Sequence, residues 1–189
     1  PGAYVGRQRF LARRQRVRDS ADAVLLFGPL YHIVEYDERQ LALNECRRLL
    51  KPGGLLYAAA ITRYATTLWA VTTYGTRHRL LDEPAFCGMI EHEIHTGQHI
   101  LNSASSYRGM GRSYFHLPAE LKTEIEAAGF LETDVRGVIG PAWLAPHLDE
   151  AWKDEAQRES ILRVVRLCEK EESILGLSTH LLAIARKEG

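Results

Sequence analysis

The chain has 189 residues and a formal net charge of zero; 46% of its residues are hydrophobic and 25% are charged. This composition is typical of a soluble globular protein with one domain, or with one domain and a small lid. The balanced charge gives no global attraction to nucleic acid or to an anionic membrane. No apolar run reaches the roughly 18 residues of a membrane-spanning helix.

The cysteines and the N-terminal sequence predict a cytoplasmic protein. Cys46, Cys87 and Cys168 are odd in number and far apart, so they indicate neither a disulfide framework nor a metal site. The arginines of residues 1–19 are not followed by the apolar stretch of a signal peptide. They suit a basic arm for nucleic acid or a solvated leader, and we favour the leader because no aromatic residues for base stacking are interleaved with them.

The first predicted unit consists of a strand, a helix and a second strand. Residues 23–27 form a short apolar run that ends at Gly28 and Pro29, which is typical of a strand buried on both faces. Residues 38–50 have leucines at helical spacing before a Lys-Pro-Gly-Gly stop, and residues 55–61 are apolar again. Such a unit predicts two parallel strands with a right-handed crossover.

Residues 62–117 interrupt this alternation and predict a lid over an active site. They hold most of the histidines and many of the aromatic residues, with helices expected at 66–74 and 84–95 and a loop at 97–112.

The alternation of helix and strand then returns. Pro118 suits the first turn of a helix that ends near Gly129, a typical C-cap residue. Residues 133–139 predict a strand, residues 148–171 are mainly helical in pattern, and residues 180–186 predict a final strand.

Motifs in this order resemble those of class I S-adenosylmethionine-dependent methyltransferases. Asp-Ala-Val at residues 22–24 resembles the start of the family's fourth strand, and Gly-Pro-Leu-Tyr-His at 28–32 resembles the loop after it in one subgroup. Leu-Lys-Pro-Gly-Gly at 50–54 resembles the turn before the fifth strand, and residues 118–130, which end in Ala-Gly-Phe, resemble the helix before the sixth. The likeness covers residues 20–189.

The resemblance implies an α/β fold with a partial Rossmann-like sheet of strands in the order 4-5-7-6 and helices on both faces. Residues 20–189 would form this domain, with the lid as an insertion at about 62–117. The glycine-rich cofactor loop that begins the family's fold, and the acidic residue that binds the ribose, are not found in this chain. Residues 24–27 would then form an open edge, and we expect residues 1–18 or a second copy of the chain, as a homodimer, to pair with it.

Ligands of open α/β sheets bind at the carboxyl ends of the strands. The resemblance therefore implies that S-adenosylmethionine contacts the residues after the first strand, namely Phe27, Gly28, Pro29 and Leu30. Tyr31 and His32 would face the methyl-transfer zone, and His116 would orient the substrate or accept a proton. A helix contact or burial explains His32 equally well, and packing near the following helix explains His116 equally well.

Substrate contacts are expected from the loop after the second strand and from the lid. The candidates are Arg63, Tyr64, His99, Asn102 and Tyr114. An ordinary surface charge is an equal explanation for Arg63. The spacing of the histidines at 92, 95 and 99 suggests a metal site, but Gly97 interrupts the helix and the pattern is not the zinc signature, so we expect no metal and a polar lid face.

These features predict S-adenosylmethionine-dependent methyl transfer to a small molecule, because a lid rich in aromatic residues and histidine suits an enclosed cavity. The alternative is a truncated, catalytically inactive protein of the same fold that dimerises or binds a ligand. We rank a nucleic-acid methyltransferase last, because no Asn-Pro-Pro-Tyr motif follows the fourth strand.

Overall fold

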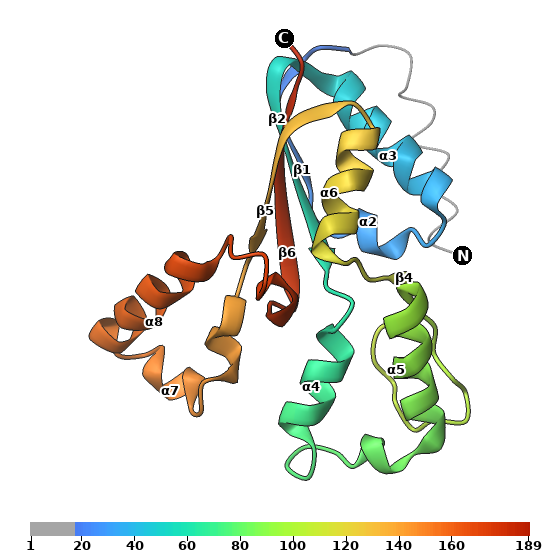
Figure 1. Ribbon diagram of the computed structural model, residues 1–189, viewed down its shortest axis with the longest axis vertical. Coiled ribbons are helices and arrows are strands. Elements are labelled where there is room, and N and C mark those ends of the chain that lie inside the picture. The colour runs from blue at the N-terminus through green and yellow to red at the C-terminus, as the bar shows by residue number, and fades with distance from the viewer. Residues whose placement is uncertain (1–17) are drawn as a thin grey trace.

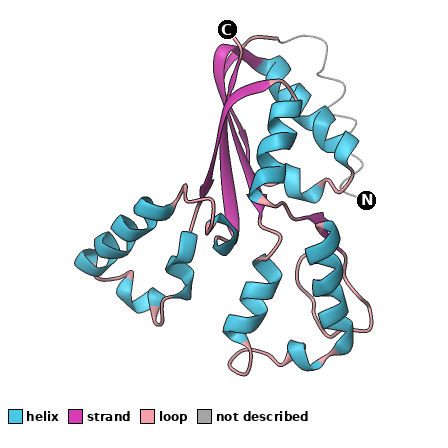
Figure 2. Ribbon diagram, viewed as in Figure 1, coloured by secondary structure: helices cyan, strands magenta, loops and turns pink. Residues whose placement is uncertain are grey.

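The computed structural model describes residues 18–189 as a four-stranded sheet with helices packed on it and two helical segments beyond one end (Figures 1 and 2). The sheet strands are β1 (Ala21–Leu26), β2 (Leu50–Ile61), β5 (Phe130–Gly137) and β6 (His180–Lys187). A separate small ribbon pairs β3 (Gln98–His99) with β4 (Ser113–Tyr114). The α-helices are α2 (Pro29–His32), α3 (Tyr36–Leu49), α4 (Ala65–Thr73), α5 (Pro84–Thr96), α6 (Pro118–Ala127), α7 (Leu148–Ala151) and α8 (Glu155–Cys168). Short 3-10 helices are η1 (Leu80–Asp82), η2 (Gly140–Leu144) and η3 (Leu175–Leu177).

The order of the strands is β1-β2-β6-β5, which corresponds to the predicted order 4-5-7-6. β1 and β2 lie side by side and are parallel, with Val24 opposite Leu56 and Leu26 opposite Ala58. β6 runs antiparallel to both of its neighbours. The predicted βαβ unit and the partial Rossmann-like sheet are confirmed. β1, β2 and β5 therefore all end at the same edge of the sheet.

The main hydrophobic core lies between one face of the sheet and the helices α2, α3 and α6, which Figure 1 shows together on that side. Alternate residues of the strands point into it, because side chains of a strand alternate between faces. The fully buried members from the strands include Leu56, Ala58, Leu181 and Ala183. Leu43 of α3 contributes from the helical layer.

The other face of the sheet is less covered. Leu25, Tyr57 and Ile184 lie in one row across three strands, and their side chains point away from the α3 and α6 layer. Leu25 is 64% exposed, and the other two are partly buried. Within residues 18–189, the helices that pack on the sheet therefore cover mainly one of the two faces on which we expected helices.

Two element boundaries differ from the sequence prediction for identifiable reasons. The Lys-Pro-Gly-Gly stop ends α3 as expected, but it lies within β2, where Gly53 has a φ of 77° and the pairing with β1 shifts register. Such a shift is a bulge, which a glycine at positive φ permits. The single helix expected at 148–171 is two helices, because Asp154 starts a new one by accepting a hydrogen bond from the Gln157 amide at 2.8 Å.

Two insertions leave the carboxyl edge of the sheet (Figure 1). Residues 62–117 follow β2 and return to it, since Thr62 forms a β-bridge with His116. They have a hydrophobic cluster of their own around Phe86 and Met89. Residues 138–179 follow β5 and hold α7 and α8. The expected basic segment, and its expected pairing with the edge of β1, fall largely on residues 1–17, outside the described part of the chain.

Candidate active site at the carboxyl edge of the sheet

The first wall of the candidate site is the turn after β1. Gly28 has a φ of 109°, a conformation that side-chain-bearing residues rarely adopt, so glycine is required for this turn. A Cβ atom there would contact little beyond the hydroxyl of Tyr31, at 3.5 Å. Phe27 is 56% exposed and Pro29 is exposed, whereas Leu30 is fully buried in the core. Leu30 can therefore reach a ligand only through its backbone.

Tyr31 and His32 lie next to each other on α2, with ring centroids 4.7 Å apart. α2 packs beside β4, so these two rings lie near the place where the lid returns to the sheet. His32 is exposed and Tyr31 is partly exposed, which leaves both accessible to a ligand.

The second wall is formed where β2 ends and the lid returns. The Arg63 amide donates to the His116 carbonyl at 2.9 Å, and the His116 amide donates to the Ile61 carbonyl at 2.8 Å. The Arg63 side chain is 8% exposed and forms an ion pair with Glu120 at 2.5 Å. Arg63 also donates to the Tyr114 hydroxyl at 3.3 Å. Arg63 is thus a buried, paired residue and not an ordinary surface charge.

A buried arginine that sequence reasoning missed joins both walls. Arg39 on α3 is 2% exposed and binds Glu124 of α6 through two nitrogens, at 2.7 and 3.1 Å. It donates as well to the carbonyls of Ile33 and Val34, at 3.1 and 2.6 Å, which form the exit from α2. Its guanidinium lies over the ring of Tyr114. Such planar, multiply bonded contacts are characteristic of arginine at buried ion pairs.

His116 belongs to the same buried cluster. It is fully buried; its Nε2 atom is 3.4 Å from a carboxylate oxygen of Glu124, and its ring contacts Tyr114 edge-on at 4.7 Å. That separation is long for a hydrogen bond, so the contact is mainly electrostatic. Burial lowers the pKa of His116, and the nearby Glu124 only partly opposes this. A fully buried imidazole can act on a ligand only through Tyr114 or after a movement.

Burial alone would raise the pKa of Glu124, but its contacts with His116 and Arg39 outweigh burial and lower that pKa. Glu124 is therefore ionised at neutral pH and balances the charge of Arg39. A groove of about 360 Å³ opens in front of this cluster. Its lining residues are Tyr36, Arg39, Tyr114, Ala119, Glu120, Thr123 and Glu124.

Three of the expected substrate residues, His99, Asn102 and Tyr64, do not join this cluster. His99 is fully buried within the lid, where its Nδ1 atom lies 2.6 Å from Glu93 and its Nε2 atom lies 3.0 Å from the Met110 carbonyl. Asn102 is exposed and accepts the Ala104 amide at 3.0 Å, which is a turn contact. Tyr64 is 39% exposed and lies beside Gly176 of η3.

The lid histidines are separated in the structure. His95 bonds the Glu91 carbonyl and is exposed, whereas His99 points into the lid. Within residues 18–189, no group of three or more histidine, cysteine, aspartate or glutamate side chains could hold a metal ion.

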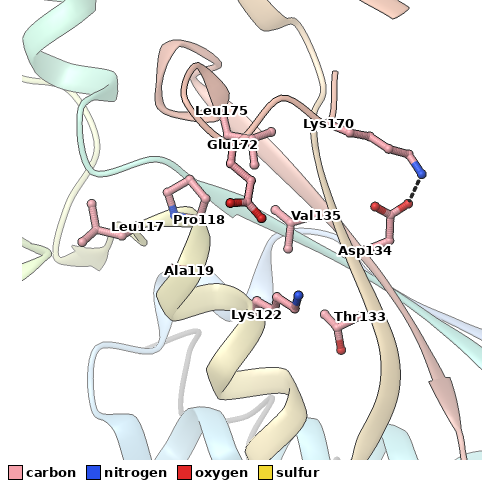
Figure 3. A pocket seen from close by; sticks show the side chains of 10 residues that line it. All are labelled: Leu117, Pro118, Ala119, Lys122, Thr133, Asp134, Val135, Lys170, Glu172 and Leu175. Atoms are coloured by element: carbon pink, nitrogen blue, oxygen red, sulfur yellow. Dashed lines mark ion pairs between the residues drawn. The ribbon is translucent and has the colours of Figure 1, made fainter. Parts of the chain in front are cut away.

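A second cleft, also of about 360 Å³, lies between the start of α6, the middle of β5 and residues 170–175 (Figure 3). Asp134 and Lys170, which lie next to each other on one side of it, form an ion pair at 2.8 Å. None of the predicted site residues lines it. We therefore place the candidate site at the turn after β1 and the groove at Tyr114, and not in this cleft.

Comparisons with known proteins agree with the motifs. A family model described as a methyltransferase domain matches residues 10–58, about a quarter of the chain, which include β1, α2 and α3. No curated protein matches the chain. The resemblance to class I S-adenosylmethionine-dependent methyltransferases is confirmed, and the described residues form an α/β fold with an open sheet of parallel and antiparallel strands.

Several solved structures are similar to most of this chain. A SAM-dependent methyltransferase from Methanosarcina mazei is 13% identical, with a TM-score of 0.49, and the match covers 92% of this chain and 62% of that one. One from Thermotoga maritima is 15% identical, with a TM-score of 0.44 and coverage of 91% and 58%. Phosphoethanolamine N-methyltransferase 2 from Haemonchus contortus, solved with S-adenosyl-L-methionine, is 13% identical, with a TM-score of 0.41 and coverage of 91% and 34%. The chain thus spans between 34% and 62% of the length of these proteins.

Within residues 18–189, no helix is both long enough and apolar enough to cross a bilayer.

Proposed function

We propose that this chain forms the later part of an S-adenosylmethionine-dependent methyltransferase that acts on a small molecule. The observation that carries the proposal is the exposed turn after β1, where Gly28 leads into α2 with the accessible rings of Tyr31 and His32. α2 packs beside β4, whose Tyr114 lines the groove. In open α/β sheets this edge is where ligands bind.

The residues after β1 fit one side of the proposed cofactor. The turn at Gly28 has no Cβ, only the Tyr31 ring lies within 4 Å of the place where one would be, and the Phe27 ring is exposed, so the backbone and an apolar surface are both available to a ligand. The bound cofactor would supply an activated methyl group on a sulfonium. The rest of its pocket would have to come from outside the described residues.

The chain's own residues would mainly position the acceptor. Transfer from a sulfonium needs alignment of the nucleophile and exclusion of water more than an activated side chain. Tyr31 and His32 are the groups that can reach a bound acceptor from α2, and Tyr114 can reach it from β4. We propose Arg63 and His116 as residues that hold Tyr114, because both contact its side chain. His99 and Asn102 would act on the substrate only if the lid rearranged.

The alternative is a protein of the same fold that binds or dimerises without catalysis. The unpaired side of β1 favours it, since Leu25 is 64% exposed and β1 has only β2 as a partner within residues 18–189. Open apolar edges recruit another strand. If that strand must come from another copy or another segment, the isolated chain would hold the cofactor weakly.

Calorimetry with S-adenosylmethionine and S-adenosylhomocysteine tests the proposal on the 189-residue chain. We expect binding that weakens at least about tenfold in Phe27→Ala, because an aromatic contact contributes on the order of 1–2 kcal/mol. Leu131→Ala is the matched control, since Leu131 is 49% exposed on β5 at the far side of the sheet. No heat of binding with either compound would favour the non-catalytic alternative, and equal weakening by both variants would place the cofactor elsewhere.

A further inference from the structure

The helix α8 presents an apolar surface that the other residues of the described range, 18–189, leave uncovered. Val165 is buried and Ile161 and Leu162 are partly buried on its inner side, toward η2 and α7. On its outer side Val164 is 57% exposed and Leu167 is 82% exposed. Exposed apolar side chains that adjoin one another on a protein surface often mark a site of interaction with another molecule.

The outer side of α8 has a protrusion at one end and a hollow at the other. Ala156, Ser160, Val164 and Leu167 are spaced four, four and three apart, so they form one stripe along the helix. Leu167 projects at the C-terminal end. At the N-terminal end Ala156 and Ser160, together with Gln157 and Ile161, border a shallow and open hollow of about 390 Å³.

The charged side chains beside the stripe also differ between the two halves of the helix. Glu155 and Glu159 lie in the N-terminal half of α8, whereas Arg163 and Arg166 lie in the C-terminal half. All four are exposed, and none has an ion-pair partner among the described residues. Arg158, the other charged residue of the N-terminal half, lies on the opposite side of the helix and donates to the Trp152 carbonyl at 3.4 Å. The outer side of α8 therefore has one acidic half and one basic half, and it is complementary to an antiparallel copy of itself.

We propose that α8 is a dimer interface at which two copies of this chain pair their α8 helices antiparallel. A two-fold axis that crosses the outer side of α8 at the height of residue 161 places Glu159 opposite the partner's Arg163 and sets Leu167 against the hollow at the partner's Ala156. The same contacts repeat on both sides of the axis, as a symmetric interface requires. The proposal concerns a different surface from the edge of β1 and does not depend on the proposed methyl transfer.

The size of the surface sets the expected strength. A helix of 14 residues is about 21 Å long, so one helix pair buries less than the roughly 800 Å² per partner of a stable complex. The dimer should therefore dissociate on dilution, with a dissociation constant on the order of micromolar.

Sedimentation equilibrium on the full chain, with circular dichroism to check folding, tests the interface. Glu159→Arg and Arg163→Glu each place like charges opposite each other and should weaken the dimer at least about tenfold. The double variant places opposite charges together again and should restore most of the affinity. Leu167→Ser should weaken the dimer as well. Glu126→Arg, which reverses an exposed charge on α6, is the control and should leave the affinity of the dimer unchanged.

A chain that stays monomeric at hundreds of micromolar would overturn the proposal. So would a dimer that is unaffected by both single reversals, or a double variant as weak as the singles. If instead Leu25→Lys alone abolished the dimer, the edge of β1 and not α8 would be the interface.

Discussion

The guanidinium carbon of Arg39 lies 3.8 Å from the centroid of the Tyr114 ring. Through this contact the helix α3, which packs on the sheet, supports β4, the strand by which the lid returns to the sheet, since Arg39 belongs to α3 and Tyr114 to β4. The same guanidinium bonds the carbonyls at the exit from α2. The buried side chain of Arg39 therefore fixes the position of the segment after β1 relative to the groove at Tyr114.

Arg39→Met should destabilise the protein by about 3–5 kcal/mol, because it leaves the carboxylate of Glu124 buried without its main partner. Urea denaturation followed by circular dichroism measures the loss. Arg112→Met is the matched control: Arg112 pairs with Glu35 at 2.8 Å, but both side chains are about 60% exposed. That exposed pair should contribute at most about 1 kcal/mol. Similar losses in the two variants would contradict the role of burial.

Two glycines of the lid offer a paired test of its return to the sheet. Gly75 and Gly97 have φ angles of 75° and 76°, so alanine is equally strained at both. A Cβ at Gly75 meets nothing within 4 Å, whereas at Gly97 it would lie 2.8 Å from the Phe115 carbonyl and 2.6 Å from Arg63. Gly75→Ala should cost about 1 kcal/mol and Gly97→Ala about 1–3 kcal/mol more in unfolding free energy. Equal losses in the two variants would mean that the backbone at Phe115 can shift to make room for the added Cβ.

Acid should destabilise the fold through His116. Burial lowers its pKa, so the unfolded chain takes up a proton near pH 6.5 while the folded protein does not. Stability therefore falls as the pH drops below about 6.5, by at most about 1.4 kcal/mol per pH unit for one proton. Glu124, whose pKa is lowered in the fold, adds a further loss below about pH 4.5.

The variant His116→Gln should lose less stability between pH 7 and pH 5.5 than the parent chain, as measured by urea midpoints at each pH. Burial also lowers the pKa of His180, but that residue is present in both proteins and its effect cancels. His92→Gln, at an exposed position, should keep the parent's pH dependence. An unchanged slope in His116→Gln would show that His116 is protonated in the folded state.

The strands and main helices could be predicted from the sequence because their signals are local. The apolar run at residues 23–27, the Lys-Pro-Gly-Gly stop and Gly129 each fix a nearby element through backbone geometry or burial. The parallel pairing of β1 and β2 follows from the length of the crossover between them.

The site was less predictable, because its key contacts join distant parts of the chain. Arg39 and Glu124 are 85 residues apart, and nothing in the pattern of α3 marks one of its arginines as buried. A signal was nonetheless present, since Arg39 falls on the apolar side of the helix with Leu43 and Cys46. The aromatic residues of the lid suggested a cavity wall, yet Phe86 packs within the lid's own core, with Trp69 and Tyr107 against it. Periodicity cannot distinguish these two uses of an aromatic side chain.

The lid should be held closed by the buried pair of Glu93 and His99. Glu93 also accepts the Thr66 hydroxyl at 2.9 Å, so the pair ties α4, α5 and β3 together. His99→Phe keeps a ring against Phe115 but leaves the carboxylate without its strongest partner, which should cost about 3–5 kcal/mol. Trypsin should then cleave faster at the exposed arginines of residues 107–112.

A second substitution separates this pairing from simple packing. Adding Glu93→Leu to His99→Phe replaces the buried charge with apolar groups, and such replacements are often neutral or stabilising. The double variant should therefore regain most of the resistance to trypsin, because the unpaired carboxylate is gone. His95→Phe, on the exposed side of α5, should cleave at the parental rate. If the double variant were cleaved as fast as His99→Phe alone, the contact of His99 with the Met110 carbonyl, and not its contact with Glu93, would hold the lid.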